Sequence, residues 1–140
     1  MKLYCCLLLV IAALLPKLST PLQAEEQANR IFELRKYTAH AGKLKALHAR
    51  FRNHTNAIFE RHGMEPIGYW TPASGDESKD TLIYLLAYPS KAARDKAWDD
   101  FRQDPAWQTV LKESRAKSGG ALVKKVESTF LAPTDYSRIK

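Results

Sequence analysis

Cysteine is scarce in this sequence, and the two residues present, Cys5 and Cys6, lie side by side near the N-terminus. Both precede Ala24, after which we expect the chain to be cleaved, so the mature form would contain no cysteine. That composition excludes disulfide bonds, thiolate metal ligands and a cysteine nucleophile from the mature protein. We therefore expect the fold to depend on its hydrophobic core alone.

The sequence also lacks an apolar run long enough to cross a membrane. The longest, Leu3 to Leu15, would rise only ~20 Å as a helix, against a hydrocarbon core of ~30 Å. A short positive start, Met1-Lys2, precedes this run, and a polar stretch ending in the small residue Ala24 follows it. This pattern predicts a secretory signal peptide over residues 1–24 and a periplasmic or secreted mature chain, with no permanent membrane span.

Positive charge exceeds negative charge, but it is not concentrated in one segment. The full chain has a net charge of +7, and removal of Lys2 and Lys17 with the leader lowers it to +5. The basic residues are scattered over predicted helices, as is typical of solvated surfaces. A nucleic-acid-binding protein would need a clustered patch with side chains that read bases. We therefore expect no nucleic-acid partner.

Hydrophobic periodicity divides the mature chain into strands and helices. Alternating or continuously apolar segments rich in β-forming residues predict strands at 30–38, 65–71, 81–88 and 121–131. Apolar stripes at helical spacing predict helices at 43–62, 91–103 and 105–117. Ser90 and the pair Asp104-Pro105 are typical of helix N-termini, Gly63 is typical of a helix C-terminus, and residues 72–80 form a polar hairpin loop.

The predicted order is β-α-β-β-α-β, with the second helical region in two parts. This order is typical of an α+β, ferredoxin-like domain with a four-stranded antiparallel sheet. We expect a single domain over residues 25–140, with its core at 30–132 and a C-terminal tail at 133–140. Because both helical regions would cover the same face of the sheet, the other face would stay open. We expect a second copy of the chain to cover it in a homodimer.

Several short motifs, taken in order, resemble those of the NIPSNAP family. In the first half they are Glu33-Leu34-Arg35-Lys36-Tyr37-Thr38, Gly42-Lys43-Leu44, His62-Gly63 and Gly68-Tyr69-Trp70. In the second half they are Tyr84-Leu85-Leu86-Ala87-Tyr88, Arg94, Trp98, Phe101, Asp104-Pro105-Ala106-Trp107 and Pro133-Thr134-Asp135-Tyr136-Ser137. The resemblance implies the dimeric α/β-barrel type of ferredoxin-like domain, in which two sheets face each other. It supplies no agreed catalytic residues. The polar, charged stretch from Ser74 to Lys79 departs from the shorter turn expected in the family.

Glu33, Arg35 and Tyr37 share one face of the first predicted strand. If that face is the open side of the sheet, these side chains would line a cavity between two sheets. Trp70 or Tyr69 and the tyrosines of the third predicted strand, Tyr84 and Tyr88, would line it with them. An acid, a guanidinium and a phenol in such a cavity can bind and polarise a small oxygenated aromatic molecule. The alternative is a structural Glu33–Arg35 ion pair across the dimer interface that serves no substrate.

The histidines do not form a recognisable metal site. His48, His54 and His62 are spaced six and eight residues apart, not at the i, i+4 spacing of a helical two-histidine site. We therefore expect no metal. A histidine that touches the core explains these positions, and the alternative is that His54 or His62 reaches into the cavity as a general base. Helical Trp98 and Trp107 are most simply explained by packing.

The sequence therefore predicts an exported homodimer that binds a small apolar or aromatic ligand and needs no cofactor. The candidate ligand-binding residues are Glu33, Arg35, Tyr37, Trp70, Tyr84, His54 and His62. One alternative is a cofactor-independent monooxygenase or isomerase, in which Arg35 stabilises negative charge and Tyr37 or His54 moves protons. A second alternative is a non-catalytic protein-interaction module.

Overall fold

A computed structural model of the chain describes residues 30–140, so the expected signal peptide lies outside the described residues. The chain forms four strands, β1 (Ile31–Ala39), β2 (Glu65–Trp70), β3 (Thr81–Tyr88) and β4 (Val123–Leu131). They pair in the order β2-β3-β1-β4, and every neighbouring pair is antiparallel. The α+β, ferredoxin-like prediction is confirmed.

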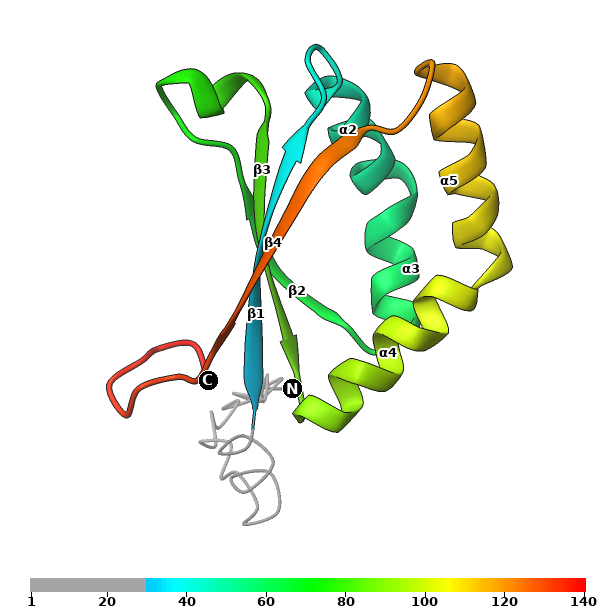
Figure 1. Cartoon of the computed structure of the whole chain (residues 1–140). Coiled ribbons are helices and arrows are strands. Elements are labelled where there is room, and N and C mark those ends of the chain that lie inside the picture. Colours follow the sequence, from blue (N-terminus) through cyan, green and yellow to red (C-terminus); the bar gives the residue numbers. More distant parts are fainter. Residues whose placement is uncertain (1–29) are drawn as a thin grey trace, which may run out of the picture.

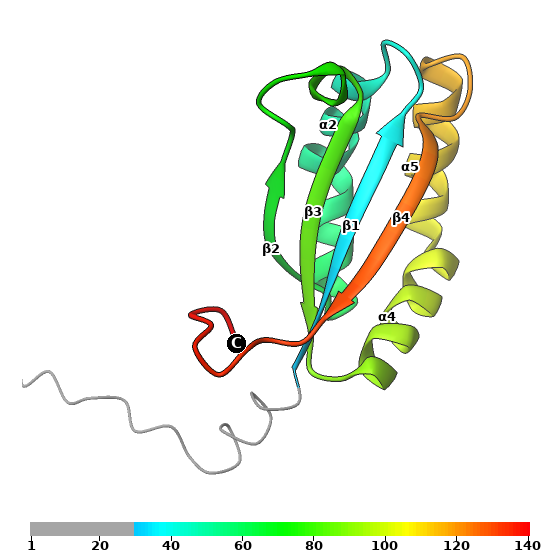
Figure 2. The same ribbon diagram turned by 60° about the vertical axis from the view of Figure 1, so that its left-hand side comes forward.

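The helices all lie on one side of the sheet, as Figures 1 and 2 show from two directions. The first helical region consists of α2 (Leu44–Arg50), the π-helical turn η1 (Phe51–Thr55) and α3 (Asn56–Arg61). The second consists of α4 (Lys91–Gln103) and α5 (Pro105–Lys117). A short 3₁₀ turn, η2 (Asp76–Lys79), lies in the loop between β2 and β3. In the described part of the chain, no helix is long and apolar enough to cross a membrane.

Helices begin and end at the capping residues that the sequence predicts. Ser90 accepts a hydrogen bond from the Ala93 amide at 3.1 Å, and Asp104 accepts one from the Ala106 amide at 2.8 Å. Gly63, with φ of 73°, lets the chain turn after α3. The single helix expected at 43–62 differs from the structure in one respect. The π-helical turn η1 interrupts it, although the apolar stripe passes through unbroken.

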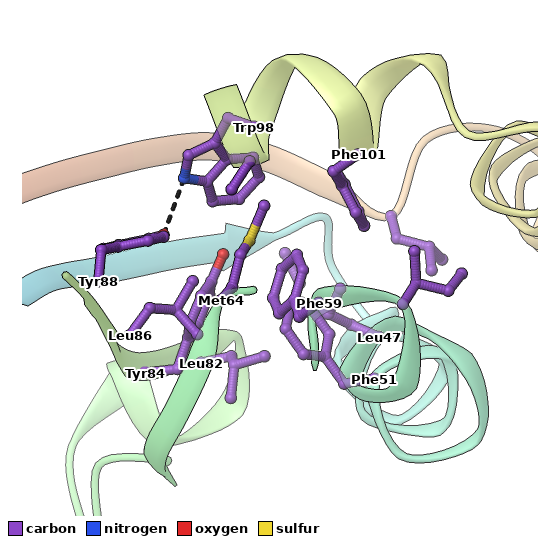
Figure 3. Close-up of a cluster of buried hydrophobic side chains, with 14 residues drawn as sticks. Leu47, Phe51, Phe59, Met64, Leu82, Tyr84, Leu86, Tyr88, Trp98 and Phe101 are labelled. Atoms are coloured by element: carbon purple, nitrogen blue, oxygen red, sulfur yellow. Dashed lines mark hydrogen bonds between the residues drawn. The ribbon is translucent and has the colours of Figure 1, made fainter. Parts of the chain in front are cut away.

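The hydrophobic core fills the space between the sheet and the helices. Figure 3 shows aromatic side chains from α2–α3, β3 and α4 meeting there. Phe59 lies at the centre, with ring centroids 4.9 Å from Phe101, 5.4 Å from Trp98 and 6.1 Å from Phe51. Edge-to-face contacts of this kind add to the stabilisation from burial. A chain whose described residues contain no cysteine is therefore held together by an aromatic core.

The opposite face of the sheet carries the other set of side chains. Cross-strand partners share a face, so Leu34 lies beside Leu85 and Thr129, and Trp70 lies beside Ile83. These positions are half-buried or exposed in the single chain. The C-terminal tail, which has no helix or strand, lies against one end of this face. There Phe32, Leu131 and Ile139 line a shallow pocket.

Candidate functional site

Glu33 is the centre of a buried polar network on the helix-covered face of the sheet. Its carboxylate is fully buried. One oxygen accepts hydrogen bonds from Arg35 at 2.6 Å and Ser128 at 2.5 Å. Both oxygens accept from the Arg94 guanidinium on α4, at 2.6 and 2.9 Å. The charge of Glu33 is therefore paired within its own subunit.

Two further donors on the helix side complete the shell around Glu33. The Trp98 indole N–H donates to the carboxylate at 3.0 Å. It also donates to the Tyr88 hydroxyl at 2.9 Å, and this second hydrogen bond is the dashed line in Figure 3. The Tyr88 hydroxyl in turn donates to Glu33 at 3.2 Å. Because these donors occupy both oxygens, Glu33 has little capacity left to accept a proton or to bind a ligand.

The electrostatics of Glu33 agree with this geometry. Burial alone would raise the pKa of its carboxyl group. The hydrogen bonds from Arg94 and Ser128 and the charge of Arg35 outweigh that effect and lower the pKa from 4.5 to about 2. Glu33 is therefore ionised at any physiological pH, and it acts as a fixed anion that orients the guanidinium groups around it.

Arg35 lies between this network and a group of tyrosines. Its guanidinium stacks on Trp98, 4.3 Å from the ring centroid, and donates to the Tyr37 hydroxyl at 3.4 Å. Burial acts to lower the pKa of Arg35. Tyr84, Tyr37 and Glu33 outweigh that effect and raise the pKa above its ordinary value, so the group stays charged. Only 11% of its side chain is exposed.

Three polar atoms of Arg35 and two tyrosines near it in the sheet are buried without a hydrogen bond of normal geometry. They are Nε of Arg35 and the hydroxyl groups of Tyr69 and Tyr84. The Tyr84 ring lies 5.1 Å from Tyr37 and 5.7 Å from Tyr69, so the unpaired groups belong to one cluster. Burial raises the pKa of Tyr84, and burial together with Glu60 raises that of Tyr69 to about 12, so both phenols keep their protons. We call Arg35, Tyr37, Tyr69 and Tyr84 the arginine–tyrosine cluster.

The structure brings together four of the residues that the sequence singles out, but not on the expected face. Glu33, Arg35, Tyr37 and Tyr84 lie together beneath the helices. The sequence placed them in a cavity between two sheets, on the condition that their face was the open one. Hydrophobic alternation identifies the two faces of a strand but not which of them the helices cover. Here Arg94 and Trp98 on α4 settle that question.

The remaining candidates lie elsewhere. Trp70 is on the opposite face and 52% exposed, and its ring covers Gly68. His62 forms a hydrogen bond of 2.7 Å with Asp104, next to the Arg61–Asp104 ion pair, so it fastens the end of α3 to the start of α5. His54 lines a separate pocket between η1 and α5. Within residues 30–140, no group of three or more histidine, cysteine, aspartate or glutamate side chains is arranged to hold a metal ion.

Sequence reasoning missed the helix-side half of the network. Arg94, Trp98 and Ser128 were not proposed as site residues, although all of them bind Glu33. A usable signal was present. A buried tryptophan needs an acceptor for its indole N–H, and a buried glutamate needs cations. Helical Trp98 and Arg94, four residues apart on one helix face, can supply both to a strand beneath them.

Comparison with known proteins places this chain in a family. The NIPSNAP family model matches residues 32–138. A NIPSNAP family protein from Agrobacterium tumefaciens is 25% identical with a TM-score of 0.68, over 80% of this chain and 92% of that one. A NIPSNAP-like domain protein from Burkholderia xenovorans is 19% identical with a TM-score of 0.67, over 79% and 90%.

A more distant structural relative is an enzyme. SnoaB, a cofactor-independent oxygenase from Streptomyces nogalater, is 14% identical with a TM-score of 0.53, over 79% of this chain and 99% of that one. At this identity the similarity concerns the fold alone. The search of curated proteins gave no match. With its family model matched from β1 almost to the C-terminus, the chain belongs to the NIPSNAP family.

Proposed function

We propose that this protein binds a small, oxygen-bearing aromatic molecule inside each subunit, between the sheet and the helices, at the arginine–tyrosine cluster. The supporting observation is that the cluster buries three hydrogen-bonding atoms without partners, on Arg35, Tyr69 and Tyr84. Each such atom costs roughly 1–3 kcal/mol. A ligand that pairs with several of them recovers that free energy on binding.

The chemistry of the free groups defines the ligand. Arginine Nε can only donate, and a neutral tyrosine hydroxyl donates readily. The natural acceptor nearby, Glu33, is already occupied by Arg35, Arg94 and Ser128. The ligand must therefore bring acceptors, such as a carboxylate, carbonyl or phenolic oxygen. The rings of Tyr37 and Phe51 pack edge to face, with centroids 6.0 Å apart, so an apolar part of the ligand would lie against this pair.

The edge strand β4 offers a route to the cluster. Val126 is the cross-strand partner of Tyr37, and Phe130 is the partner of Glu33, so both point to the helix side. Yet they are 47% and 49% exposed. The helices thus leave this strand uncovered, with Ser128 between the two exposed side chains. This margin is the route by which we propose that a small molecule reaches Arg35.

The same proposal includes export and dimerisation. The leader at 1–24 supports secretion or a periplasmic location, with cleavage after Ala24. The open face, with Leu34, Ile83 and Leu85 beside Trp70, supports its burial against a second copy. In this arrangement the ligand sites lie on the outer sides of two facing sheets, one in each subunit.

A catalytic role is the second candidate. The similarity to a cofactor-independent oxygenase favours it at the level of the fold. Arg35 would stabilise negative charge that develops on the bound molecule, and Tyr37, which accepts from Arg35, would move a proton. His54, which lies in another pocket, is a weaker choice for that task. An interaction module with no ligand remains the alternative to both.

Native mass spectrometry of the secreted, mature protein tests the proposal. We expect a small molecule at one copy per subunit, which is lost from Arg35→Met and weakened in Tyr84→Phe. The control is Arg102→Met, because Arg102 is exposed on α4 and its guanidinium forms a surface ion pair with Asp99. An unliganded protein that also fails to bind any member of a panel of aromatic carboxylates and phenols would favour the interaction module.

A further inference from the structure

A separate pocket lies between the first helical region and α5. It has a volume of about 270 Å³. Ala46 and Arg50 of α2 and His54 of η1 line one side, and Val110, Ser114 and Lys117 of α5 line the other. It includes no residue of the arginine–tyrosine cluster.

Arg50 is the unusual member of this pocket. It is only 7% exposed, and its Nε atom has no hydrogen-bond partner. Its guanidinium stacks on Trp107 at 5.2 Å and donates one long hydrogen bond, of 3.4 Å, to Ser114. Among residues 30–140, no carboxylate lies within ion-pair distance of it, whereas Arg35 and Arg94 both pair with Glu33. Buried charges normally have such a partner, because desolvation is costly without one.

The backbone beside Arg50 is also irregular. The π-helical turn begins at the next residue, Phe51, and the Thr55 hydroxyl donates to the Arg50 carbonyl at 3.3 Å. Such turns insert one extra residue into a helix and occur frequently at functional sites. Here the insertion sets the directions in which Asn53 and His54 leave the helix, and both line the pocket.

The charges of the pocket favour a monoanion. Burial lowers the pKa of Arg50, and although Tyr37 and Tyr84 oppose this effect, the net direction is downward. The guanidinium therefore lacks a counter-charge strong enough to offset its burial. A second positive group, Lys117, is neutralised by Glu113 at 3.6 Å. Glu113 also lines the pocket and would repel a dianion such as phosphate. The remaining wall, formed by Ala46, Val110 and Leu122, is apolar.

From these features we infer that the pocket between α2–η1 and α5 binds a small aliphatic monocarboxylate. The carboxylate group pairs with the Arg50 guanidinium and the Ser114 hydroxyl. The hydrocarbon part lies against Ala46, Val110 and Leu122. This site shares no lining residue with the arginine–tyrosine cluster, and it adds a second ligand class to the protein.

Titration calorimetry on the mature protein tests this inference, with hexanoate as the probe, hexanol as its neutral counterpart and inorganic phosphate as the dianion. We expect hexanoate to bind at least ~10-fold more tightly than either of the others, because a charge-assisted pair with arginine is strong. Arg50→Met should weaken hexanoate binding by ~10-fold or more. Arg52→Met, which removes an exposed charge two residues away, should leave it unchanged.

Two further variants keep the test decisive. Arg50→Lys keeps the charge and loses the planar fork, so it should bind hexanoate several-fold more weakly even if Arg50→Met does not fold. Tyr69→Phe should leave hexanoate binding unchanged, because Tyr69 belongs to the arginine–tyrosine cluster and does not line this pocket. The inference is overturned if hexanoate does not bind, if phosphate binds as tightly, or if both Arg50 variants bind hexanoate like the wild type.

Discussion

Glu33 orients the guanidinium groups of Arg35 and Arg94, and in our proposal it does not itself contact the ligand. Its carboxylate is surrounded by donors from β1, β4 and α4, and its pKa of about 2 reflects them. It holds Arg35 against Trp98 and leaves Arg35 Nε available. The structural ion pair weighed from the sequence is thus present, but within one subunit, and it positions the guanidinium that we assign to ligand binding.

Replacement of Glu33 by glutamine should destabilise the fold strongly. It leaves Arg35 without its counter-charge and Arg94 paired with Asp95 alone. Loss of one member of a buried pair costs about 3–5 kcal/mol. We expect a free energy of unfolding lower by about that amount in urea denaturation. Leu34→Val, which trims an adjacent side chain on the other face, is the control. A variant as stable as the wild type would show that the network contributes little.

Glu33 also predicts a specific loss of stability in acid. Its folded pKa of about 2 lies below the ordinary 4.5, so its contribution is complete above pH 4.5 and is lost as the pH falls from 4.5 towards 2. The shift corresponds to about 3 kcal/mol. Denaturation curves recorded across this range should therefore decline steeply for the wild type and less steeply for Glu33→Gln. Parallel declines would contradict the assignment.

Replacement of Tyr84 by phenylalanine is expected to stabilise the ligand-free fold, whereas replacement of Glu33 destabilises it. The Tyr84 hydroxyl is fully buried and makes no hydrogen bond of normal geometry, although Tyr37 and Arg35 lie close enough to affect its pKa. Its removal therefore eliminates part of the desolvation cost of ~1–3 kcal/mol for an unpaired polar group. Tyr84→Phe should therefore have a higher Tm than the wild type in the absence of ligand, and a lower affinity for ligand. Tyr88→Phe is the matched comparison, because its hydroxyl is bonded to Glu33 and its loss should lower the Tm.

At the scale of elements, the junction of α4 and α5 links the helical layer. Asp104 caps α5 through the amides of Ala106 and Trp107, and it also binds Arg61 and His62 at the end of α3. These contacts lower the pKa of Asp104. One side chain therefore joins both helical regions.

Two substitutions at Asp104 separate its roles. Asp104→Ala removes the cap and the ion pair, and we expect the Tm to fall by ~5 °C or more. Asp104→Asn keeps an acceptor for the α5 amides, so a smaller decrease is expected, measured by thermal unfolding followed by circular dichroism. If the two variants melt together, the cap contributes nothing beyond the charge.

The sequence predicts regular elements well because their signals are local. The bounds of α4 and α5 follow from Ser90 and Asp104-Pro105, which act within one turn. The π-helical turn was missed because the stripe through Leu47, Phe51 and Ile58 remains buried across it. The site was predicted only in part. Period-2 alternation grouped Glu33 with Arg35 and Tyr37, whereas the partners Arg94 and Ser128 come from distant segments.

At the scale of the whole molecule, we propose a dimer of two identical subunits. Leu34, Ile83 and Leu85 lie on a sheet face that no helix covers. We expect light scattering of the mature protein at micromolar concentration to give twice the mass of one chain. Leu34→Glu should shift the mass to that of the monomer, because a charge at the centre of this face is buried in the dimer. A monomeric wild type would remove the dimer from the proposal.

We propose that the ligand lies inside each subunit, and the three tryptophans can report its position. The Trp98 indole N–H bonds to Glu33 beside the arginine–tyrosine cluster, while Trp70 lies on the open face. Their ¹H–¹⁵N indole resonances, assigned with single Trp→Phe variants, can be followed while 4-hydroxybenzoate or the co-purified molecule is added. We predict that the Trp98 resonance shifts with saturation and that the Trp70 resonance stays in place. A shift at Trp70 with Trp98 unchanged would place the ligand between the sheets and contradict the account.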